Sequence, residues 1–302
     1  NSRIPMYIAI TQNVVNIIAS LGLVYLCGMK VEGVALGTLI AQYAGFLMGI
    51  ALWMHNYGRL KRLWEIKNYK LKIKGGEEAG IWEKGVMLRF FQVNRDIFLR
   101  TLCLVAVTLF FTSAGASQGE IILAVNTLLM QLFTLFSYVM DGFAYAGEAL
   151  SGRYIGARNR EAFTDTVRHL FGWGAVMAVL FTLVYALGGN AFLGLLTDDK
   201  EVIAVADTYF YWALAVPAVG IAAFIWDGIF IGATATRGML LSMAAATVSF
   251  FILYYGLHPV LANHALWLAF LTYLLMRGVV QTGLSREVIR RAFPSKKEPA
   301  WR

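Results

Sequence analysis

The chain has 302 residues, of which 59% are hydrophobic and 15% are charged, and its mean hydropathy is +0.62. A soluble domain carries about 25% charged residues. The charges here are clumped between continuously apolar runs, each long enough to cross a hydrocarbon core of about 30 Å. This composition excludes a soluble enzyme, and the absence of alternating apolar and polar residues excludes a membrane β-barrel.

Eight apolar segments predict an all-α integral membrane protein with eight transmembrane helices. In chain order these helices are expected at 4–28, 33–55, 88–113, 120–150, 164–188, 202–231, 236–257 and 263–284.

The positive charges are distributed unequally between alternate loops. When each charge is assigned to its nearer helix end, all 26 Lys and Arg residues except Lys30 and Lys200 fall on one side. By the positive-inside rule that side is cytoplasmic, so both ends of the chain are expected in the cytoplasm of a bacterium, with the helices in its inner membrane. The net charge of +8 therefore follows from membrane topology, and no nucleic acid is expected as a partner.

Two weak internal similarities indicate a repeat. Residues 33–43 resemble 263–273, and residues 2–10 resemble 235–243. The first and seventh helices lie six helices apart and run in the same direction across the membrane. This period is typical of parallel repeats, in which two lobes are related by an axis along the membrane normal.

The repeat predicts the domain organisation of the chain as part of a twelve-helix, two-lobe protein. Four helices of the first lobe are expected to precede this chain. The predicted parts are the last two helices of an N-terminal lobe (1–57), a cytoplasmic linker (58–87), a complete six-helix C-terminal lobe (88–285) and a basic cytoplasmic tail (286–302).

Three ionisable side chains are expected near the middle of the membrane. From a rise of about 1.5 Å per residue, Asp227, Asp141 and Arg100 lie roughly 15 to 18 Å from the cytoplasmic helix ends. Charges at this depth are costly and are candidates for function. We interpret Asp227 and Asp141 as proton- or cation-coupling residues, with Na⁺ at Asp227 as one form of this hypothesis. The alternative is structural, with Arg100 neutralising one or both aspartates.

Three other charged residues of the predicted helices, Asp96, Arg95 and Arg277, bear on this group. Asp96 lies four residues before Arg100, so the two can pair on one face of a helix. Arg95 and Arg277 have long side chains that can reach toward the membrane surface, so we give them little weight.

Polar residues within the apolar segments have two interpretations. In the first interpretation they line a water-filled cavity, and in the second they form hydrogen bonds between helices. The cavity-lining candidates are Asn126, Gln131, Glu148, Asn13 and Asn16. The sequence has no HExxH motif and no phosphate-binding loop, so we expect no enzyme activity, no metal centre and no cofactor.

Several segments resemble the DinF-like branch of the multidrug and toxic compound extrusion (MATE) family. They are FFQVNRDIFLRTL at 90–102, DGFAYAGEALSGRYIGAR at 141–158, DGIFIGAT at 227–234 and NHALWLAFL at 263–271. The resemblance implies a two-lobed antiporter, functional as a monomer, that exports small organic and often cationic compounds in exchange for H⁺ or Na⁺. It also implies that the eight helices correspond to the family's fifth to twelfth.

The resemblance carries over unevenly to single residues. Asp227 falls about where NorM-type members have a cation-coordinating aspartate. In the DinF-like branch, proton coupling is usually placed on the first and fifth helices. Here the fifth-helix pattern N-I-x-L-D has Ser20 in place of the common aspartate. Coupling then depends on the first helix, which this sequence does not include, or on Asp227 and Asp141, or this member is atypical of the branch.

A second function in the same wider superfamily is a lipid-linked oligosaccharide flippase. Such proteins tend to line their cavity with several basic residues. The sequence offers Arg100 as the one strong candidate near the middle of the membrane, so we favour the antiporter.

Overall fold

The computed structural model describes residues 3–26, 28–73 and 84–293, and the chain divides into two compact units, Asn1–Glu83 and Lys84–Arg302. The regular elements of the described residues are all α-helices. Eight of these helices are long and apolar enough to cross a membrane. The predicted all-α class with eight spans is therefore confirmed.

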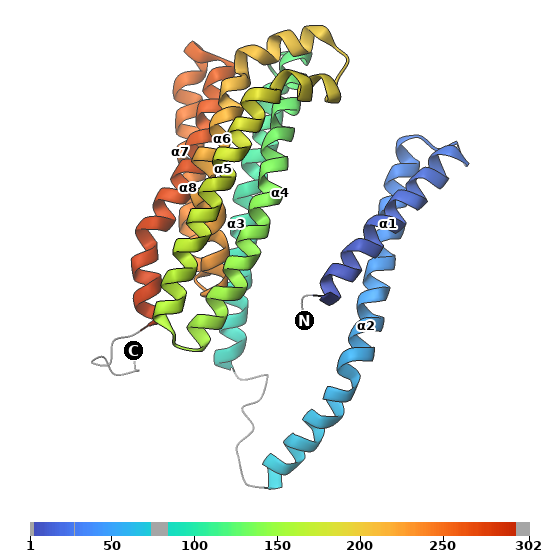
Figure 1. Cartoon of the computed structure of the whole chain (residues 1–302), viewed down its shortest axis with the longest axis vertical. Helices are drawn as coiled ribbons and strands as arrows, with labels where there is room; N and C mark the ends of the chain where they lie inside the picture. Colours follow the sequence, from blue (N-terminus) through green and yellow to red (C-terminus); the bar gives the residue numbers. More distant parts are fainter. Residues whose placement is uncertain (1–2, 27, 74–83, 294–302) are drawn as a thin grey trace. The chain divides into compact units, whose positions relative to one another are not determined.

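The first unit is a hairpin of two helices, α1 (Arg3–Tyr25) and α2 (Val31–Ile73). Figure 1 shows the two running antiparallel. They approach closely at Gly37, where a β-carbon would overlap the Ser20 side chain. The apolar part of α2, Val31–His55, agrees with the expected span. The helix continues to Ile73 because the following Arg, Lys, Leu and Glu residues are good helix formers.

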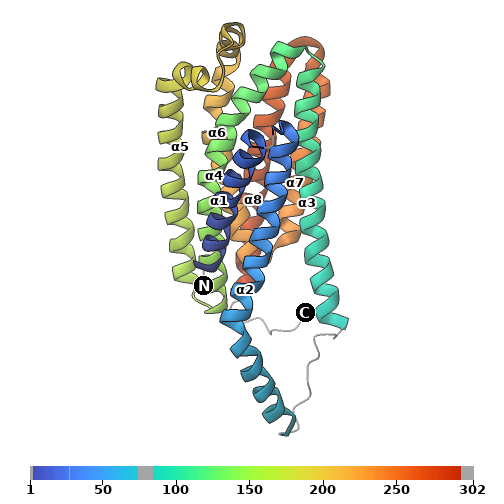
Figure 2. The ribbon, with the colours of Figure 1, turned by 90° about the vertical axis from the view of Figure 1, so that its right-hand side faces the viewer.

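The second unit is a bundle of six helices. Their axes are roughly aligned in two perpendicular views, and successive helices run in opposite directions (Figures 1 and 2). The helices are α3 (Lys84–Ala116), α4 (Glu120–Gly156), α5 (Arg160–Leu196), α6 (Lys200–Gly232), α7 (Thr236–Leu261) and α8 (Asn263–Ala292). Helix α6 packs against α4, α5 and α8, and α8 also packs against α7.

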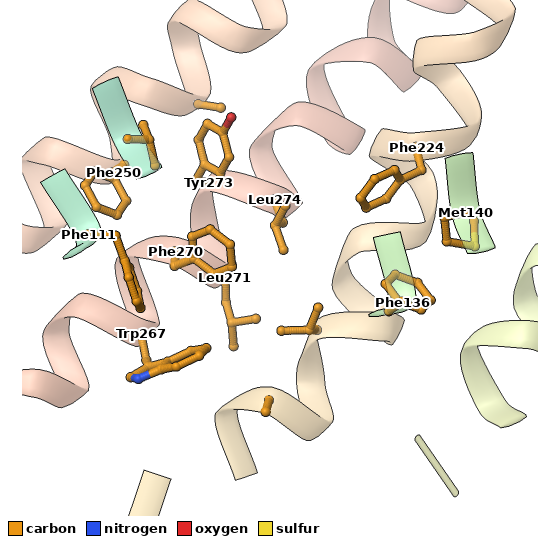
Figure 3. Packing of buried hydrophobic residues seen from close by; sticks show 14 of the residues in the cluster. Phe111, Phe136, Met140, Phe224, Phe250, Trp267, Phe270, Leu271, Tyr273 and Leu274 are labelled. Carbon is orange, nitrogen blue, oxygen red and sulfur yellow. The ribbon is translucent and has the colours of Figure 1, made fainter. Parts of the chain in front are cut away.

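Helices α6 and α8 form the centre of this bundle. In each of them 61% of the most apolar window is buried, compared with 17% in α3 and 22% in α5. Figure 3 shows the aromatic core around them. The Phe111 ring lies 5.2 Å from Trp267 on one side of α8, and the Phe136 ring lies 5.9 Å from Phe224 between α4 and α6.

The contact between α4 and α6 depends on glycine. A β-carbon at Gly228 would overlap the carbonyl group of Ala144, and one at Gly232 would overlap the carbonyl oxygen of Glu148. The two glycines form a GxxxG pattern, which permits close approach of helix backbones in membranes. Asp227 precedes the first of them, so this close contact also sets the position of its carboxylate.

Candidate functional site

The Asp227 carboxylate joins three helices of the bundle. Its Oδ2 accepts hydrogen bonds from Nη2 of Arg100 on α3 and from Nη2 of Arg277 on α8, the latter at 2.6 Å. Its Oδ1 accepts one from Nε2 of Gln281, also on α8, at 2.6 Å. The Asp227 residue is only 7% exposed. We call these four residues the charge cluster.

The guanidinium of Arg277 is held from two sides. It is paired with Asp227, and its central carbon lies 5.6 Å from the centre of the Tyr273 ring and 5.9 Å from that of Phe224. Aromatic faces attract cations at such distances. A buried charge is tolerated when it is paired and hydrogen-bonded, so the surroundings of Arg277 stabilise it in its charged form.

The Asp141 carboxylate has different surroundings. It lies on α4, is half-buried, and interacts electrostatically with Asp227, Arg277 and Arg100. Within the described parts of the chain, no residue donates a hydrogen bond to Asp141 or forms an ion pair with it. The two predicted coupling residues therefore lie near each other, but one is bound by three donors and the other is available.

The expected pair between Asp96 and Arg100 is not the one observed, and this prediction was wrong. Arg100 points to Asp227, while Asp96 Oδ1 lies 3.0 Å from Nη2 of Arg95. Thr236 on α7 donates its hydroxyl to Asp96 Oδ2 at 3.5 Å. Burial does not distinguish the two carboxylates, since Asp96 is 5% and Asp227 7% exposed. The Arg100 side chain instead reaches across to α6, where it shares the Asp227 carboxylate with Arg277.

Asn126 forms hydrogen bonds between helices and does not line a cavity. Its amide exchanges two hydrogen bonds with Asn263 on α8, at 2.8 and 3.0 Å, and its Oδ1 also accepts from Nε1 of Trp267 at 2.9 Å. Asn126 is 2% exposed. Of the two interpretations given above, the hydrogen-bonding one describes this residue.

The remaining polar candidates lie apart from the charge cluster or have no bond to it. In the hairpin unit, Asn16 accepts from Ser20 at 3.0 Å and from Thr38 on α2 at 3.5 Å, whereas Asn13 is exposed. In the bundle, Gln131 is exposed and Glu148 is half-buried on α4. A role of these residues in lining a cavity stays a prediction.

Two members of the charge cluster, Arg277 and Gln281, are not among the predicted site residues. Both are buried, with 5% and 0% exposure. A signal was present, because Tyr273, Arg277 and Gln281 are spaced at i, i+4 and i+8 and so form one polar stripe on an otherwise apolar helix. Because Arg277 was counted with the charges at the cytoplasmic helix ends, this stripe was not recognised as part of the site.

Metal binding finds little support in the described residues. They contain no group of three or more His, Cys, Asp and Glu side chains that could hold a metal ion. At Asp227 both oxygens already face donors, two of them cationic. The two arginines repel a further cation at this carboxylate, so the geometry does not support Na⁺ at Asp227.

Comparison with known proteins agrees with this architecture. The MatE family model matches residues 97–256, more than half of the chain. The chain is 38% identical over 278 residues to DNA damage-inducible protein F of Escherichia coli (strain K12), covering 92% of this chain and 58% of that relative. It is 21% identical over 279 residues to Protein DETOXIFICATION 42 of Arabidopsis thaliana, covering 91% and 50%.

Solved structures show the same fold. A crystal structure of a variant of the Vibrio cholerae MATE transporter VcmN aligns with a TM-score of 0.79 at 15% identity, covering 96% of this chain and 63% of that one. The chain thus spans 50% to 63% of the length of these relatives. The chain belongs to the MatE family, and its described residues include eight helices that are long and apolar enough to cross a membrane.

Proposed function

We propose that the protein is a secondary active antiporter that exports small organic cations in exchange for H⁺ or Na⁺ by alternating access. It acts as a monomer in the bacterial inner membrane, with both ends of this chain in the cytoplasm and with no cofactor. Family membership supports the efflux role. The observation that carries the coupling is the available carboxylate of Asp141 beside the charge cluster.

The formal charges of this region support exchange at Asp141. When Asp141 is ionised, its charge and those of Asp227, Arg100 and Arg277 sum to zero. When Asp141 binds H⁺ or Na⁺, the same four residues carry a net charge of +1. Charges a few ångströms apart interact strongly away from bulk water. The loaded site, with its net charge of +1, therefore repels an organic cation, and release of the coupling ion removes this repulsion.

Asp227, Arg100 and Arg277 have a different role in this proposal. Their mutual bonds hold one negative and two positive charges in fixed places on three helices. These fixed charges set the electrostatic potential at Asp141, where the coupling ion binds and is released. Asp227 thus acts as a positioning residue, and Asp141 is the group that contacts the coupling ion.

The experiment is transport by Asp141→Asn in the intact protein reconstituted into proteoliposomes. Export of a fluorescent cation is measured under an imposed proton gradient and, separately, an imposed sodium gradient. We expect the variant to lose gradient-driven export, since an amide cannot take up a proton or neutralise a cation. Asp207→Asn, an exposed carboxylate on α6, is the matched control and retains export. Gradient-driven export by Asp141→Asn at the wild-type rate would refute the proposal.

One observation favours the flippase as a second candidate. The bundle holds two arginines near the middle of its spans, Arg100 and Arg277, where the sequence suggested one. The Nε atoms of both are buried and have no partner among the described residues. Competition between a polyprenyl-phosphate sugar and a cationic dye for the purified protein tests this candidate. Tight binding of the lipid that displaces the dye favours a flippase, and dye binding unaffected by the lipid excludes it.

A further inference from the structure

An open crevice lies between α4 and α5, on the side of the loop that joins them, and has a volume of about 450 Å³. Its walls include Phe143 and Tyr154 of α4 and Asp165, His169 and Trp173 of α5. None of these residues belongs to the charge cluster. The crevice is therefore a separate feature of the bundle, which the transport proposal does not use.

The crevice changes from polar to apolar along the helices. Counting from the 157–159 loop at about 1.5 Å per residue, Asp165 and His169 lie at roughly 9 and 15 Å, and Phe143 and Trp173 both lie at about 21 Å. The hydrocarbon core of a bilayer is about 30 Å thick beneath its headgroup layers. The polar end thus lies near headgroup depth and the apolar end within the acyl chains, as an amphiphilic ligand requires.

The polar end of the crevice presents hydrogen-bond acceptors. Nδ1 of His169 lies 2.7 Å from the backbone carbonyl oxygen of Asp165. A carbonyl oxygen only accepts, so Nδ1 carries the proton and Nε2 of the neutral ring is an acceptor. Thr166 donates its hydroxyl to the Ala162 carbonyl at 2.8 Å, which leaves its oxygen lone pairs available. With the Asp165 carboxylate, these groups suit a ligand that carries several N–H donors.

Two positively charged side chains, Arg168 and Arg153, are adjacent in sequence to wall residues of the crevice. Nη1 of Arg168 lies 3.9 Å from Asp165 Oδ1, and both side chains are largely exposed, at 78% and 55%. The Arg153 guanidinium lies 5.9 Å from the centre of the Tyr154 ring. Exposed ion pairs of this length are weak, so both partners are available to a ligand. A phosphate matches the arginines, and an ammonium next to it matches Asp165.

We propose that the crevice between α4 and α5 binds one molecule of phosphatidylethanolamine from the bilayer. The primary ammonium of the lipid contacts Asp165 and His169, its phosphate lies toward Arg168, and an acyl chain passes Phe143 and Trp173. Phosphatidylcholine lacks N–H donors on its headgroup, and phosphatidylglycerol lacks the ammonium. The crevice therefore distinguishes these lipids by hydrogen bonding and by charge.

The experiment uses Trp173 as a reporter in the intact protein in nanodiscs. Lipids brominated on an acyl chain quench nearby tryptophans, and the Trp173 contribution is the difference between the wild type and Trp173→Phe. We expect brominated phosphatidylethanolamine to quench this contribution at a lower mole fraction than brominated phosphatidylcholine or phosphatidylglycerol. Asp165→Asn removes that preference. Asp198→Asn, an exposed carboxylate in the loop between α5 and α6, keeps it.

Three outcomes overturn the proposal. Equal quenching by all three lipids at every mole fraction indicates ordinary contact with the surrounding bilayer. Stronger quenching by phosphatidylglycerol shows that the arginines alone select the ligand. Recovery of Trp173 fluorescence when a cationic dye is added assigns the crevice to exported compounds. Because no gradient is applied, these results are independent of whether Asp141 couples transport to an ion.

Discussion

The helices α4 and α6 each carry an Asp-Gly step, and the two steps have opposite surroundings. Asp227 of α6 is buried and receives three hydrogen bonds, and Gly228 lies against the backbone of α4. Asp141 of α4 is half-buried, and Gly142 has open space where a side chain would lie. The same pair of residue types therefore builds a fixed junction on one helix and an available carboxylate on the other.

The difference follows from the position of each helix in the bundle. Around Asp227 helix α6 is enclosed, since residues 223–230 are all buried and the helix packs against α4, α5 and α8. A carboxylate on such a helix must be paired, since an unpaired buried charge is costly. On α4 the face that carries Asp141 is less enclosed, and within the described residues its carboxylate has no hydrogen-bond or ion-pair partner.

The largest effect on stability is expected from Asp227→Asn. The change leaves Arg100 and Arg277 buried with one neutral acceptor between them, and breaking a buried pair in this way costs about 3–5 kcal/mol. Thermal unfolding of the purified protein in detergent measures the loss. If this variant unfolds at the wild-type temperature, Asp227 is not the structural partner of the two arginines and returns as a candidate for ion coupling.

A smaller effect, opposite in sign between the two steps, is expected from alanine at the glycines. Gly228→Ala forces α6 away from Ala144 and should lower the free energy of unfolding by about 1–3 kcal/mol, as overpacking does. Gly142→Ala is the matched change at an open helical position, and should raise it by about 0.5–1 kcal/mol. Unfolding curves of both variants give the comparison. Equal responses would show that the close contact of α4 and α6 is absent in the membrane.

The smallest effect on stability is expected from Asp141→Asn. No hydrogen bond to Asp141 is lost within the described residues, so the free energy of unfolding should change by less than about 0.5 kcal/mol, as for substitutions away from buried networks. The same thermal unfolding assay measures it beside Asp227→Asn. A large loss of stability would place Asp141 in the structural network and remove the contrast between the two aspartates.

The sequence predicts a depth for each charged residue but does not predict which residues pair. Asp227, Asp141 and Arg100 were predicted near one level of the membrane, and the structure brings them within electrostatic reach. The partner of Arg100 was wrong, and Arg277 was assigned to the membrane surface. Depth follows from counting residues along a helix, whereas a pair depends on the rotation of each helix about its axis and on which helices are neighbours.

Apolar length and charge by themselves determined that this chain forms eight spanning helices, because the cost of placing a residue in lipid is set residue by residue. Which helices are central was decided only by tertiary packing. Helices α3 and α6 have the same mean hydropathy of 2.0 in their most apolar windows, yet 17% of one window and 61% of the other are buried. Lipid is as apolar as the protein interior, so hydropathy cannot separate a helix that faces lipid from one that faces its neighbours.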